Sequence, residues 1–450
     1  MTGIQMENLE FTAGFTAGSS SKIAVIGAGI SGLTGAYYLT KLLGCEVHLF
    51  EARNRLGGHA HSHTLEFANE RPFVVDTGFI VFNDRNYPNF RALLAELEVA
   101  PHPTDMSFSV SLAGRRGRGG FEYNGGNWRG LFAQYSNAFR PSFWQLLREI
   151  MRFTRRASET LKQGITIDES IGDWLTNNNF KGAFVAHYLL PMSGAIWSTS
   201  PRRVLDFPIS ALFHFLANHG LLDLSDRPQW YSLRGGSQTY VQSLARQIPD
   251  TLRLNEGVQA VITTPTGVEI VTSSGQREPF DAVLMACHAD DALKLLDQPD
   301  ALERDILGSF SYSENRVFLH SDATLMPVRR AAWASWNYVG SGQQDDELIA
   351  VSYWMNHLQE LTTKHLMVVT LNPAKQPDHI HRELIYRHPQ FDLRARQAQR
   401  RRAELQGHRR IWYAGAHWRW GFHEDGARSA LEALQSMGVD APLLGEMEGR

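Results

Sequence analysis

Apolar runs and helical periodicity alternate in the first part of the chain. The run Lys22–Ile26 is apolar at four of its five positions and precedes a cluster of glycines, which is typical of a strand buried in a parallel sheet. A helical pattern follows from about Ser31 to Leu43, and a second strand is predicted over Glu46–Phe50, just before Glu51. The order strand, glycine turn, helix, strand predicts the beginning of an α/β domain with a parallel sheet.

A different pattern occupies the later part of the chain, where short β-rich runs are separated by turn signals. Pro265–Gly267 and Ser274–Gly275 mark two turns, and an apolar strand is predicted over Ala282–Ala286. A further strand is expected within residues 409–415, and a helix is expected from about Gly426 to Met437. The segments between these patterns are mixed and show no clear internal repeat.

The segment Pro141–Ser158 has the periodicity of an amphipathic helix. One side carries Phe143, Leu147, Ile150 and Met151, and the other side largely carries Arg148, Arg152, Arg155 and Arg156. Such a helix either covers a domain core with its arginines in water, or lies on an anionic membrane surface. The sequence leaves both interpretations open, so a peripheral membrane contact through residues 143–156 is undecided.

The composition is that of a globular protein without strong charge bias. Of 450 residues, 43% are hydrophobic and 20% are charged, and the formal net charge is −3. This balance gives no support for a nucleic-acid partner, and the length predicts two domains. Cys45 and Cys287 form no C-x-x-C pair, and neither a signal peptide nor a transmembrane run is evident. A cytoplasmic protein is therefore expected, with its oligomeric state undetermined.

A glycine-rich turn joins the first strand to the helix. It reads G-A-G-I-S-G, a G-x-G-x-x-G in the strand–turn–helix context of a dinucleotide site. Gly27 permits the tight turn, Gly29 lets a pyrophosphate approach the backbone, and Gly32 lets the helix pack close to the strand. Glu51 follows Gly32 by 19 residues, where a carboxylate accepts hydrogen bonds from ribose hydroxyls and disfavours NADP. The alternative is a glycine turn in an α/β protein that binds no nucleotide.

The loop after the second strand reads E-A-R-N-R-L-G-G-H and can continue this site. Arg53 and Arg55 suit bidentate contacts with phosphate, and Gly57-Gly58 suits a close approach of the backbone. These residue types predict a second stretch of loop at the pyrophosphate.

Three histidines then follow at alternate positions, which raises the alternative of a metal site. His59, His61 and His63 would share one face of a strand. No carboxylate or cysteine joins them at ligand spacing, so they are expected to form pocket wall and loop, and no metal is expected.

These segments resemble the flavin-containing amine oxidase and phytoene desaturase superfamily, whose members carry G-x-G-x-x-G and then E-A-x-x-R-x-G-G-R. The chain departs from this pattern at the last position, where His59 replaces arginine. The segment V-V-D-T-G-F-I-V-F is similar to the family's D-x-G segment, and the segment around Val258 to its adenine-binding segment. The C-terminal Y-A-G-A-H-W-R-W-G-F-H-E-D-G resembles its flavin segment. The likeness is greatest to bacterial proteins described as predicted NAD/FAD-binding or amine-oxidase-like.

The resemblance implies a fold and a cofactor. The expected fold class is α/β, with a discontinuous Rossmann-like FAD-binding domain of the glutathione-reductase-like type and an α+β substrate domain. The expected boundaries are a flexible leader at 1–20, the FAD-binding domain at 21–95, 232–292 and 405–440, and the substrate domain at 96–231 and 293–404. FAD is expected to bind non-covalently through Gly27, Gly29, Ile30, Ser31, Gly32, Glu51, Ala52, Arg53, Arg55, Gly57, Gly58, His59, Asp76, Thr77, Gly78, Val258, Gly415, Phe422, Asp425, Gly426 and Ala427.

The resemblance also implies flavin chemistry at the C-terminal segment. A helix that opens at Gly426 and Ala427 would stabilise reduced flavin with its N-terminal amides. The lysine with which amine oxidases commonly hold a water corresponds to Arg316, which does not readily lose its proton. His417 and His423 are the remaining candidates for proton transfer, because an unperturbed imidazole titrates near neutrality.

Aromatic residues indicate the character of the substrate. Trp197, Phe213, Phe215 and Trp230 add apolar bulk to the predicted substrate domain, which favours a small apolar or lipid-like molecule. The resemblance implies an FAD-dependent oxidoreductase that transfers hydride from a C–N or C–C bond of such a substrate to flavin N5. Two alternatives stay open: a non-redox isomerase or mutase of the same fold, and a flavin-binding protein without catalysis.

Overall fold

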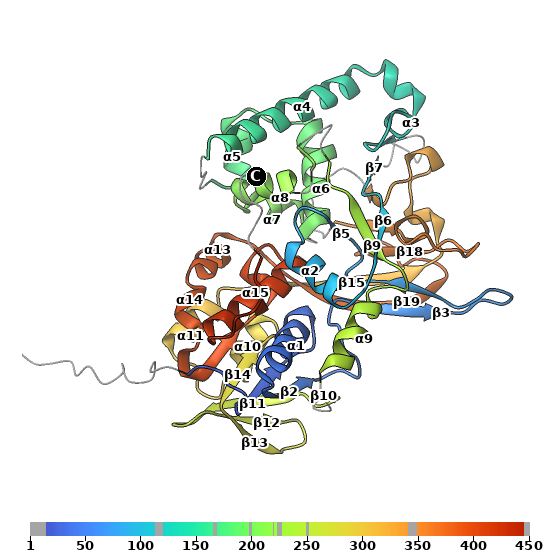
Figure 1. Cartoon of the computed structure of the whole chain (residues 1–450). Coiled ribbons are helices and arrows are strands. Elements are labelled where there is room, and N and C mark those ends of the chain that lie inside the picture. Colours follow the sequence, from blue (N-terminus) through green and yellow to red (C-terminus); the bar gives the residue numbers. More distant parts are fainter. Residues whose placement is uncertain are drawn as a thin grey trace, which may run out of the picture.

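Figure 1 shows the computed structural model of the chain, which describes residues 15–112, 120–164, 169–197, 200–218, 220–222, 227–248, 252–340 and 349–444. The sequence predicts a flexible leader over residues 1–20. Residues 1–14 of this leader lie outside the described residues. The fold is of mixed α/β content. Among the helices of the described residues, none is long and apolar enough to cross a membrane.

A five-stranded parallel sheet carries the glycine-rich turn, with the strand order β10-β2-β1-β14-β20. The strands are β1 (Lys22–Ile26), β2 (Glu46–Glu51), β10 (Leu252–Leu254), β14 (Ala282–Met285) and β20 (Ile411–Tyr413). The first strand is confirmed at both ends, and β2 and β14 each end one residue from the predicted position. These strands come from distant parts of the chain. The inner strands β1 and β14 are short apolar runs of the kind that a parallel sheet buries on both faces, whereas the edge strand β10 is partly exposed.

Alternate residues of these strands enter two different cores. Ile23 and Val25 pack with helices on one face, and Ala24 and Ile26 pack on the other face. The first face is covered by α1 (Ile30–Leu43), α2 (Pro88–Glu96), α9 (Gln238–Gln247) and α15 (His423–Ser436). The second is covered by the antiparallel strands β11 (Val258–Thr263), β12 (Val268–Thr272) and β13 (Arg277–Phe280), with α10 (Ala289–Leu295), α11 (Ala301–Leu307), α13 (Leu393–Arg400) and α14 (Arg402–Leu405). Both turns predicted between the antiparallel strands are confirmed.

A second, seven-stranded sheet has the order β19-β15-β18-β17-β16-β7-β8. Its strands are β7 (Phe108–Leu112), β8 (Phe121–Asn124), β15 (Tyr312–His320), β16 (Trp336–Gly340), β17 (Val351–Trp354), β18 (Val368–Leu371) and β19 (Ile380–Pro389). Its core is shared with α4 (Pro141–Lys162), α5 (Ile171–Asn177), α6 (Leu190–Trp197), α7 (Pro201–Leu205), α8 (Ile209–Asn218) and α12 (Met355–Leu358). Smaller pairings join β3 (Ser62–Leu65) to β4 (Phe73–Asp76), and β9 (Trp230–Leu233) to β5 (Phe82–Asn83) and β6 (Pro101–Thr104).

The C-terminal helix begins three residues earlier than predicted. α15 starts at His423, and Asp425 Oδ2 accepts hydrogen bonds from the backbone N–H groups of Phe422 (2.8 Å) and Trp420 (3.1 Å). This carboxylate closes the first turn, so the helix start is not set by a glycine. Gly426 is instead the point of contact with α1, because a Cβ there would lie 2.6 Å from Ile30 Cγ2.

The amphipathic helix α4 covers the core. Phe143, Leu146 and Phe153 are buried against the seven-stranded sheet and its helices, as the covering interpretation predicts. Met151, which the sequence places on the apolar side, is 60% exposed. The buried stripe follows the 3.6-residue helical repeat through Leu146 and Phe153, and this repeat leaves Met151 outside it.

Candidate functional site

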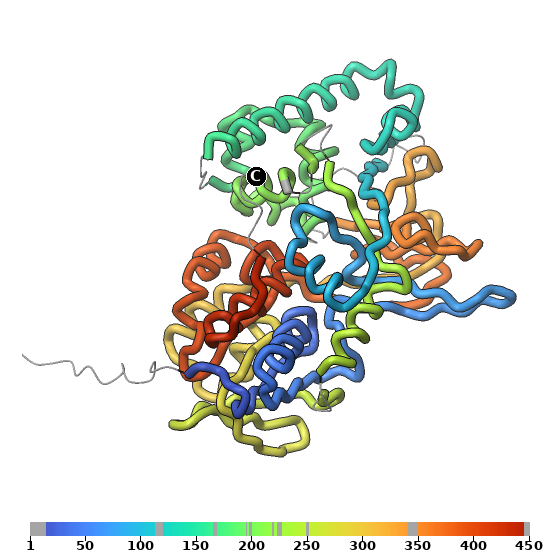
Figure 2. Tube along the Cα trace, in the orientation of Figure 1, coloured from blue at the N-terminus to red at the C-terminus, as the bar shows by residue number. Residues whose placement is uncertain are grey.

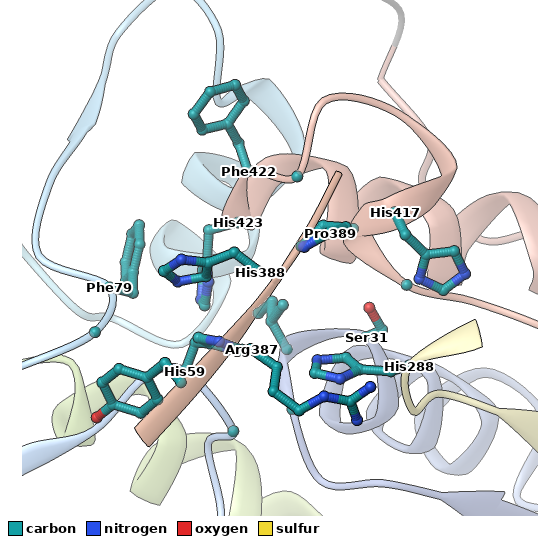
Figure 3. A pocket seen from close by; sticks show the side chains of 18 of the residues that line it. Ser31, His59, Phe79, His288, Arg387, His388, Pro389, His417, Phe422 and His423 are labelled. Carbon is teal, nitrogen blue, oxygen red and sulfur yellow. The ribbon is translucent and has the colours of Figure 1, made fainter. Parts of the chain in front are cut away.

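A pocket of about 710 Å³ lies where the carboxyl ends of β1, β2 and β14 meet the seven-stranded sheet. Figure 3 shows side chains that line it. Its walls include the turn after β1, the loop after β2, the residues after β14, and the end of β19. Ligands of open parallel sheets bind outside the carboxyl ends of the strands, so this is the place where the fold favours a ligand.

Two glycine segments face each other in the wall of this pocket. Gly57 donates its backbone N–H to the Ala28 carbonyl at 2.8 Å, and a Cβ on Gly58 would lie 2.9 Å from the Gly29 Cα. Gly27 has φ of +100°, and a Cβ there would lie 2.9 Å from a backbone carbonyl oxygen, so this position requires glycine. A Cβ on Gly29, in contrast, would meet no heavy atom within 4 Å. The open space before Gly29, at the N-terminus of α1, fits the pyrophosphate of a dinucleotide.

Glu51 lies beside this cradle at the end of β2. Its Oε2 accepts a hydrogen bond from the Ala28 backbone N–H at 2.9 Å, and its Oε1 accepts one from the Arg53 N–H at 2.9 Å. The carboxylate lines the pocket and retains lone pairs for ribose hydroxyls. The backbone N–H of Glu256 donates to the Glu51 carbonyl at 3.0 Å, which brings the neighbouring Val258 to the same part of the pocket wall.

Most residues that the sequence predicts to bind the cofactor line this pocket. They are Gly27, Gly29, Ile30, Ser31, Glu51, Ala52, Arg53, Arg55, Gly57, Gly58, His59, Thr77, Gly78, Val258, Gly415 and Phe422. Those that do not line it are Gly32, Asp76, Asp425, Gly426 and Ala427. Gly32 packs against the turn, since a Cβ there would lie 1.8 Å from the Gly27 carbonyl oxygen. These five residues lie behind the pocket lining. Their positions suit the packing of the pocket wall better than the direct contacts with the cofactor that the sequence predicts.

Asp76 is a buried junction between segments that are far apart in the chain. Its carboxylate accepts hydrogen bonds from Ser62 Oγ (2.5 Å), Ser237 Oγ (2.7 Å) and Gln359 Nε2 (2.9 Å), and from the Ser237 backbone N–H (3.0 Å). Burial raises the pKa of Asp76 to about 6 against the effect of these donors. The carboxylate thus holds the β3–β4 pair, the start of α9 and the segment after α12 together behind the pocket.

Five buried or half-buried histidines surround the pocket, namely His59, His288, His388, His417 and His423 (Figure 3). Burial lowers the pKa of His288 and His388 to about 4 and that of His423 to about 3. Burial also lowers the pKa of His59 and of His417 well below the ordinary value of an imidazole. Neutral imidazoles each offer one N–H and one lone pair. Among the described residues, His59 Nε2, His288 Nδ1 and His417 Nε2 are buried without a hydrogen-bond partner, so they suit the polar groups of a bound cofactor or substrate.

A chain of amide groups fixes the proton of His388. The Arg316 backbone N–H donates to Asn372 Oδ1 at 3.0 Å, so Asn372 Nδ2 is the atom that donates to Asn315 Oδ1, at 2.7 Å. The Asn315 amide therefore turns its Nδ2 toward His388 Nδ1, 3.1 Å away. Because Nδ2 can only donate, His388 Nδ1 is the acceptor and the ring proton lies on Nε2. His388 thus keeps its Nε2–H as the donor for a ligand in the pocket.

Asn315→Asp is expected to reverse this proton arrangement. A carboxylate at this place accepts a hydrogen bond, so the proton should move to Nδ1 and the pKa of His388 should rise from about 4. Nitrogen NMR of the histidine side chains, assigned with His388→Gln, reports which ring nitrogen carries the proton. His320, which lies on the same strand as Asn315 and is bonded to Thr370, serves as an internal control that should not change. A His388 ring already protonated at Nδ1 in the unmodified protein would contradict the assignment.

The two histidines predicted to transfer protons both line the pocket, in different surroundings. The His423 ring stacks on Phe79, with ring centroids 3.8 Å apart and an interplanar angle of 8°, and its Nε2 lies 2.6 Å from the Tyr240 hydroxyl. His417 keeps an unbonded Nε2, as described above. His423 is therefore held in place by stacking and a hydrogen bond, and its low pKa makes it a weak base.

The prediction for Arg316 is wrong. This side chain is exposed, pairs with Glu383 at 2.7 Å and lies outside the pocket lining. Side chains alternate along β15, which buries Asn315 and leaves its neighbour Arg316 in solvent. From this strand Tyr312 lines the pocket directly, and Asn315 acts on it through its contact with His388.

His288 and His388 had no motif in the sequence to reveal them. His388 belongs to β19 of the seven-stranded sheet, and only the tertiary fold brings it to the pocket. His288 follows the end of β14, so the rule that ligands bind at the carboxyl ends of parallel strands is the signal that could have found it.

The three alternating histidines do not act as one group. His61 Nδ1 lies 2.8 Å from the Tyr386 hydroxyl and His63 Nε2 lies 3.1 Å from Thr77 Oγ1, whereas His59 precedes strand β3 and packs beside His388. Within the part of the chain that the structure describes, the residues found at metal-ligand spacing are His288, Asp290 and Asp291. Both of these carboxylates are already paired with Arg387 and Lys294.

Comparisons with known proteins agree with this arrangement. A family model described as flavin containing amine oxidoreductase matches residues 30–395. The chain is 24% identical over 279 residues to an L-amino acid dehydrogenase of Synechocystis sp., which is 59% of this chain and 56% of that protein. It thus spans little more than half the length of this curated relative.

Solved structures share the fold at low sequence identity. The CLA-producing fatty acid isomerase from P. acnes superposes with a TM-score of 0.65 at 14% identity, over 93% of this chain and 99% of that one. A redesigned variant of putrescine oxidase superposes with a TM-score of 0.64 at 15% identity, over 93% and 98%.

Proposed function

Because this chain belongs to the family of flavin-containing amine oxidoreductases and its cofactor is non-covalently bound FAD, we propose that it is an FAD-dependent oxidoreductase. The substrate proposed is a small apolar or lipid-like molecule that is oxidised at a C–N or C–C bond. The observation that carries the proposal is the continuity of one pocket from the glycine cradle to an apolar end. Such continuity lets a nucleotide cofactor and a second molecule share one pocket.

The residues present fit FAD. The Gly29 cradle would hold the pyrophosphate, Glu51 the ribose, and the unpaired histidine nitrogens other polar groups. When bound, FAD supplies the hydride acceptor. The first-turn backbone amides of α15, from His423 to Asp425, are the groups that would stabilise negative charge at the helix N-terminus.

The apolar end supports the proposed substrate class. Met192, Ile196 and Trp197 of α6 and Phe215 of α8 line it, with Phe422 beside Phe215 at a ring-centroid distance of 5.4 Å. Such walls exclude water and orient an apolar molecule by shape. The low pKa values of the pocket histidines favour catalysis by positioning over catalysis by a side-chain base, with His417 and His423 in supporting roles.

The domain division is part of the proposal. Residues 21–95, 232–292 and 405–440 are assigned to the FAD-binding domain, of the glutathione-reductase-like type. Residues 96–231 and 293–404 are assigned to the substrate domain. The division is supported by the parallel sheet, all of whose strands come from the first set, and by the seven-stranded sheet, all of whose strands come from the second.

An anaerobic screen tests the proposed function. The FAD-loaded protein is mixed with primary amines, L-amino acids and unsaturated fatty acids, and the absorbance of oxidised flavin is followed. Bleaching by one class is expected, with a rate that falls for Trp197→Asp, which places a charge in the apolar wall. Ile385→Ser, at an exposed position on β19, serves as the matched control. Substrate conversion without bleaching at any stage would favour an isomerase or mutase.

A further inference from the structure

Exposed apolar side chains gather on one short stretch of the chain. Trp128, Tyr135, Phe139, Trp144 and Met151 are 76%, 84%, 88%, 47% and 60% exposed. They lie on α3 (Trp128–Leu131), on the 3-10 helix Tyr135–Phe139 and on α4. We call these five residues the α3–α4 cluster. Among the other large hydrophobic residues of the described chain, only Val328 and Ile385 are at least as exposed as Trp144, although the rest of the chain is many times longer.

The α3–α4 cluster lies at an outer edge of the molecule. Figures 1 and 2 show α3 and α4 along the side remote from α1 and the parallel sheet. The opposite face of α4, through Phe143, Leu146 and Phe153, is already buried in the core. The exposed residues are therefore additional to the apolar face that folding requires.

The outward stripe of α4 alternates apolar and basic residues. Trp144, Arg148, Met151 and Arg155 are spaced by four, three and four residues, which places them on one helix face, and all four are exposed. A purely apolar stripe would be suited to packing against the apolar surface of another protein. Arginine interleaved with tryptophan and methionine suits an interface in which apolar groups enter and guanidinium groups stay at the phosphates.

The charge of this stretch is strongly one-sided. Between Trp128 and Arg156 the chain has six arginines and one acidic residue, Glu149. Glu149 is paired with Arg152 at 2.6 Å, and Arg155 lies 3.9 Å from Glu159, just after the stretch. Four of the six arginines therefore remain without an acidic partner among the ion pairs of the described residues. The protein as a whole has a formal net charge of −3, which makes this surface a local exception. A partner with many negative charges is therefore favoured.

We propose that the α3–α4 cluster and its arginines dock the protein on an anionic membrane surface. Tryptophan and tyrosine favour the headgroup region, and each basic residue near an anionic leaflet strengthens attachment. The protein would lie on the lipid without spanning it. This inference does not rest on the proposed reaction, because it concerns a surface remote from the glycine cradle.

Vesicle sedimentation of the FAD-loaded protein tests the inference. Vesicles of phosphatidylcholine alone and of phosphatidylcholine with phosphatidylglycerol are compared at low and high salt. The triple variant Trp128→Ser, Tyr135→Ser and Phe139→Ser removes exposed apolar groups, and Arg129→Gln with Arg148→Gln removes charge. Ile385→Ser with Leu254→Ser is the matched control, since both residues are exposed on other elements.

The unmodified protein should bind the anionic vesicles, and salt should weaken binding by screening. The affinity of the triple variant for anionic vesicles should be lower by at least about tenfold, because burying even one large apolar side chain raises affinity by roughly that factor. The control pair should bind as the unmodified protein does. Absence of binding to anionic vesicles, or equal binding by the triple variant, would overturn the proposal. A concentration-dependent dimer that the triple variant loses would also overturn it, since the occupant would then be a second copy.

Discussion

Gly29→Val is expected to give a folded protein that binds essentially no FAD. A Cβ on Gly29 meets no protein atom within 4 Å, so the valine side chain costs little in the empty fold. It would instead fill the space of the cradle that fits the pyrophosphate. The expected loss of affinity is at least about a hundredfold, or roughly 2.7 kcal/mol. The far-ultraviolet circular dichroism spectrum reports whether the variant is folded, and the FAD content after purification reports whether it binds the cofactor.

Substitutions at two other glycines distinguish loss of the space for FAD from strain in the backbone. Gly18→Val is the matched control, because a Cβ on Gly18 also meets nothing within 4 Å and Gly18 does not line the pocket, so FAD binding should not change. Gly27→Val should instead destabilise the fold, because φ is +100° and a Cβ would lie 2.9 Å from a carbonyl oxygen. Full FAD content in Gly29→Val would show that the cradle does not hold the pyrophosphate.

The second large expected effect is a loss of stability in mild acid. Among the described residues, ten histidines have lowered pKa values because they are buried, namely His59, His61, His63, His187, His288, His320, His381, His388, His417 and His423. On unfolding, each regains its ordinary pKa of about 6.5. Between about pH 6.5 and about pH 4 the unfolded chain therefore binds more protons than the folded chain, and stability falls as the pH falls.

Three buried carboxyl groups, Asp76, Glu424 and Asp425, act in the opposite direction because burial raises their pKa values. Burial raises the pKa of Asp76 to about 6 and that of Asp425 to about 7, so each favours the folded state as the pH falls through those values. The histidines outnumber them. A shift of one pKa unit is worth about 1.4 kcal/mol, so the net loss should reach several kcal/mol, comparable to the total stability of about 5–15 kcal/mol of ordinary domains.

Urea unfolding of the FAD-loaded protein, followed by circular dichroism at about pH 7 and about pH 5, measures this loss. His61→Gln with His63→Gln should reduce the pH dependence, since both rings lie together with centroids 4.1 Å apart and have pKa values lowered to about 3 and about 4. Asp425→Asn should steepen it, because one of the opposing groups is removed. Equal or greater stability at the lower pH would contradict the assignment of neutral histidines.

The sequence predicted the nucleotide half of the molecule because local rules determine it. Gly27 has φ of +100° and a Cβ on Gly32 would lie 1.8 Å from the Gly27 carbonyl oxygen, so the turn itself requires both glycines, and the strand Lys22–Ile26 is recognisable from its own composition. The neighbouring strands β14 and β20 were found in the same way. Their order in the sheet, however, is a property of the whole chain and has no local signal.

The C-terminal segment around Gly426 and the strand β15 were predicted less well, because tertiary contacts determine the roles of their residues. Gly426 looked like a helix start, but it is glycine because α1 lies against it, and Asp425 supplies the cap. Arg316 looked like a substitute for a lysine, although alternation along β15 selects Asn315 instead. His388 could not be predicted, since its tautomer depends on two asparagine side chains from different strands and loops.

A substrate bound in the apolar end of the pocket is expected to be oxidised while bound FAD is reduced. The most direct test is a single-turnover reaction without oxygen, in which one equivalent of an active substrate is mixed with the FAD-loaded protein. The mass of the product is then determined by mass spectrometry. Oxidation of a C–C bond should give an alkene lighter by two hydrogen atoms, and oxidation of a C–N bond should give the carbonyl compound that forms when water hydrolyses the imine. In either case the product should form in the same amount as the flavin that loses its absorbance. A product of unchanged mass, formed while the flavin remains oxidised, would contradict this expectation.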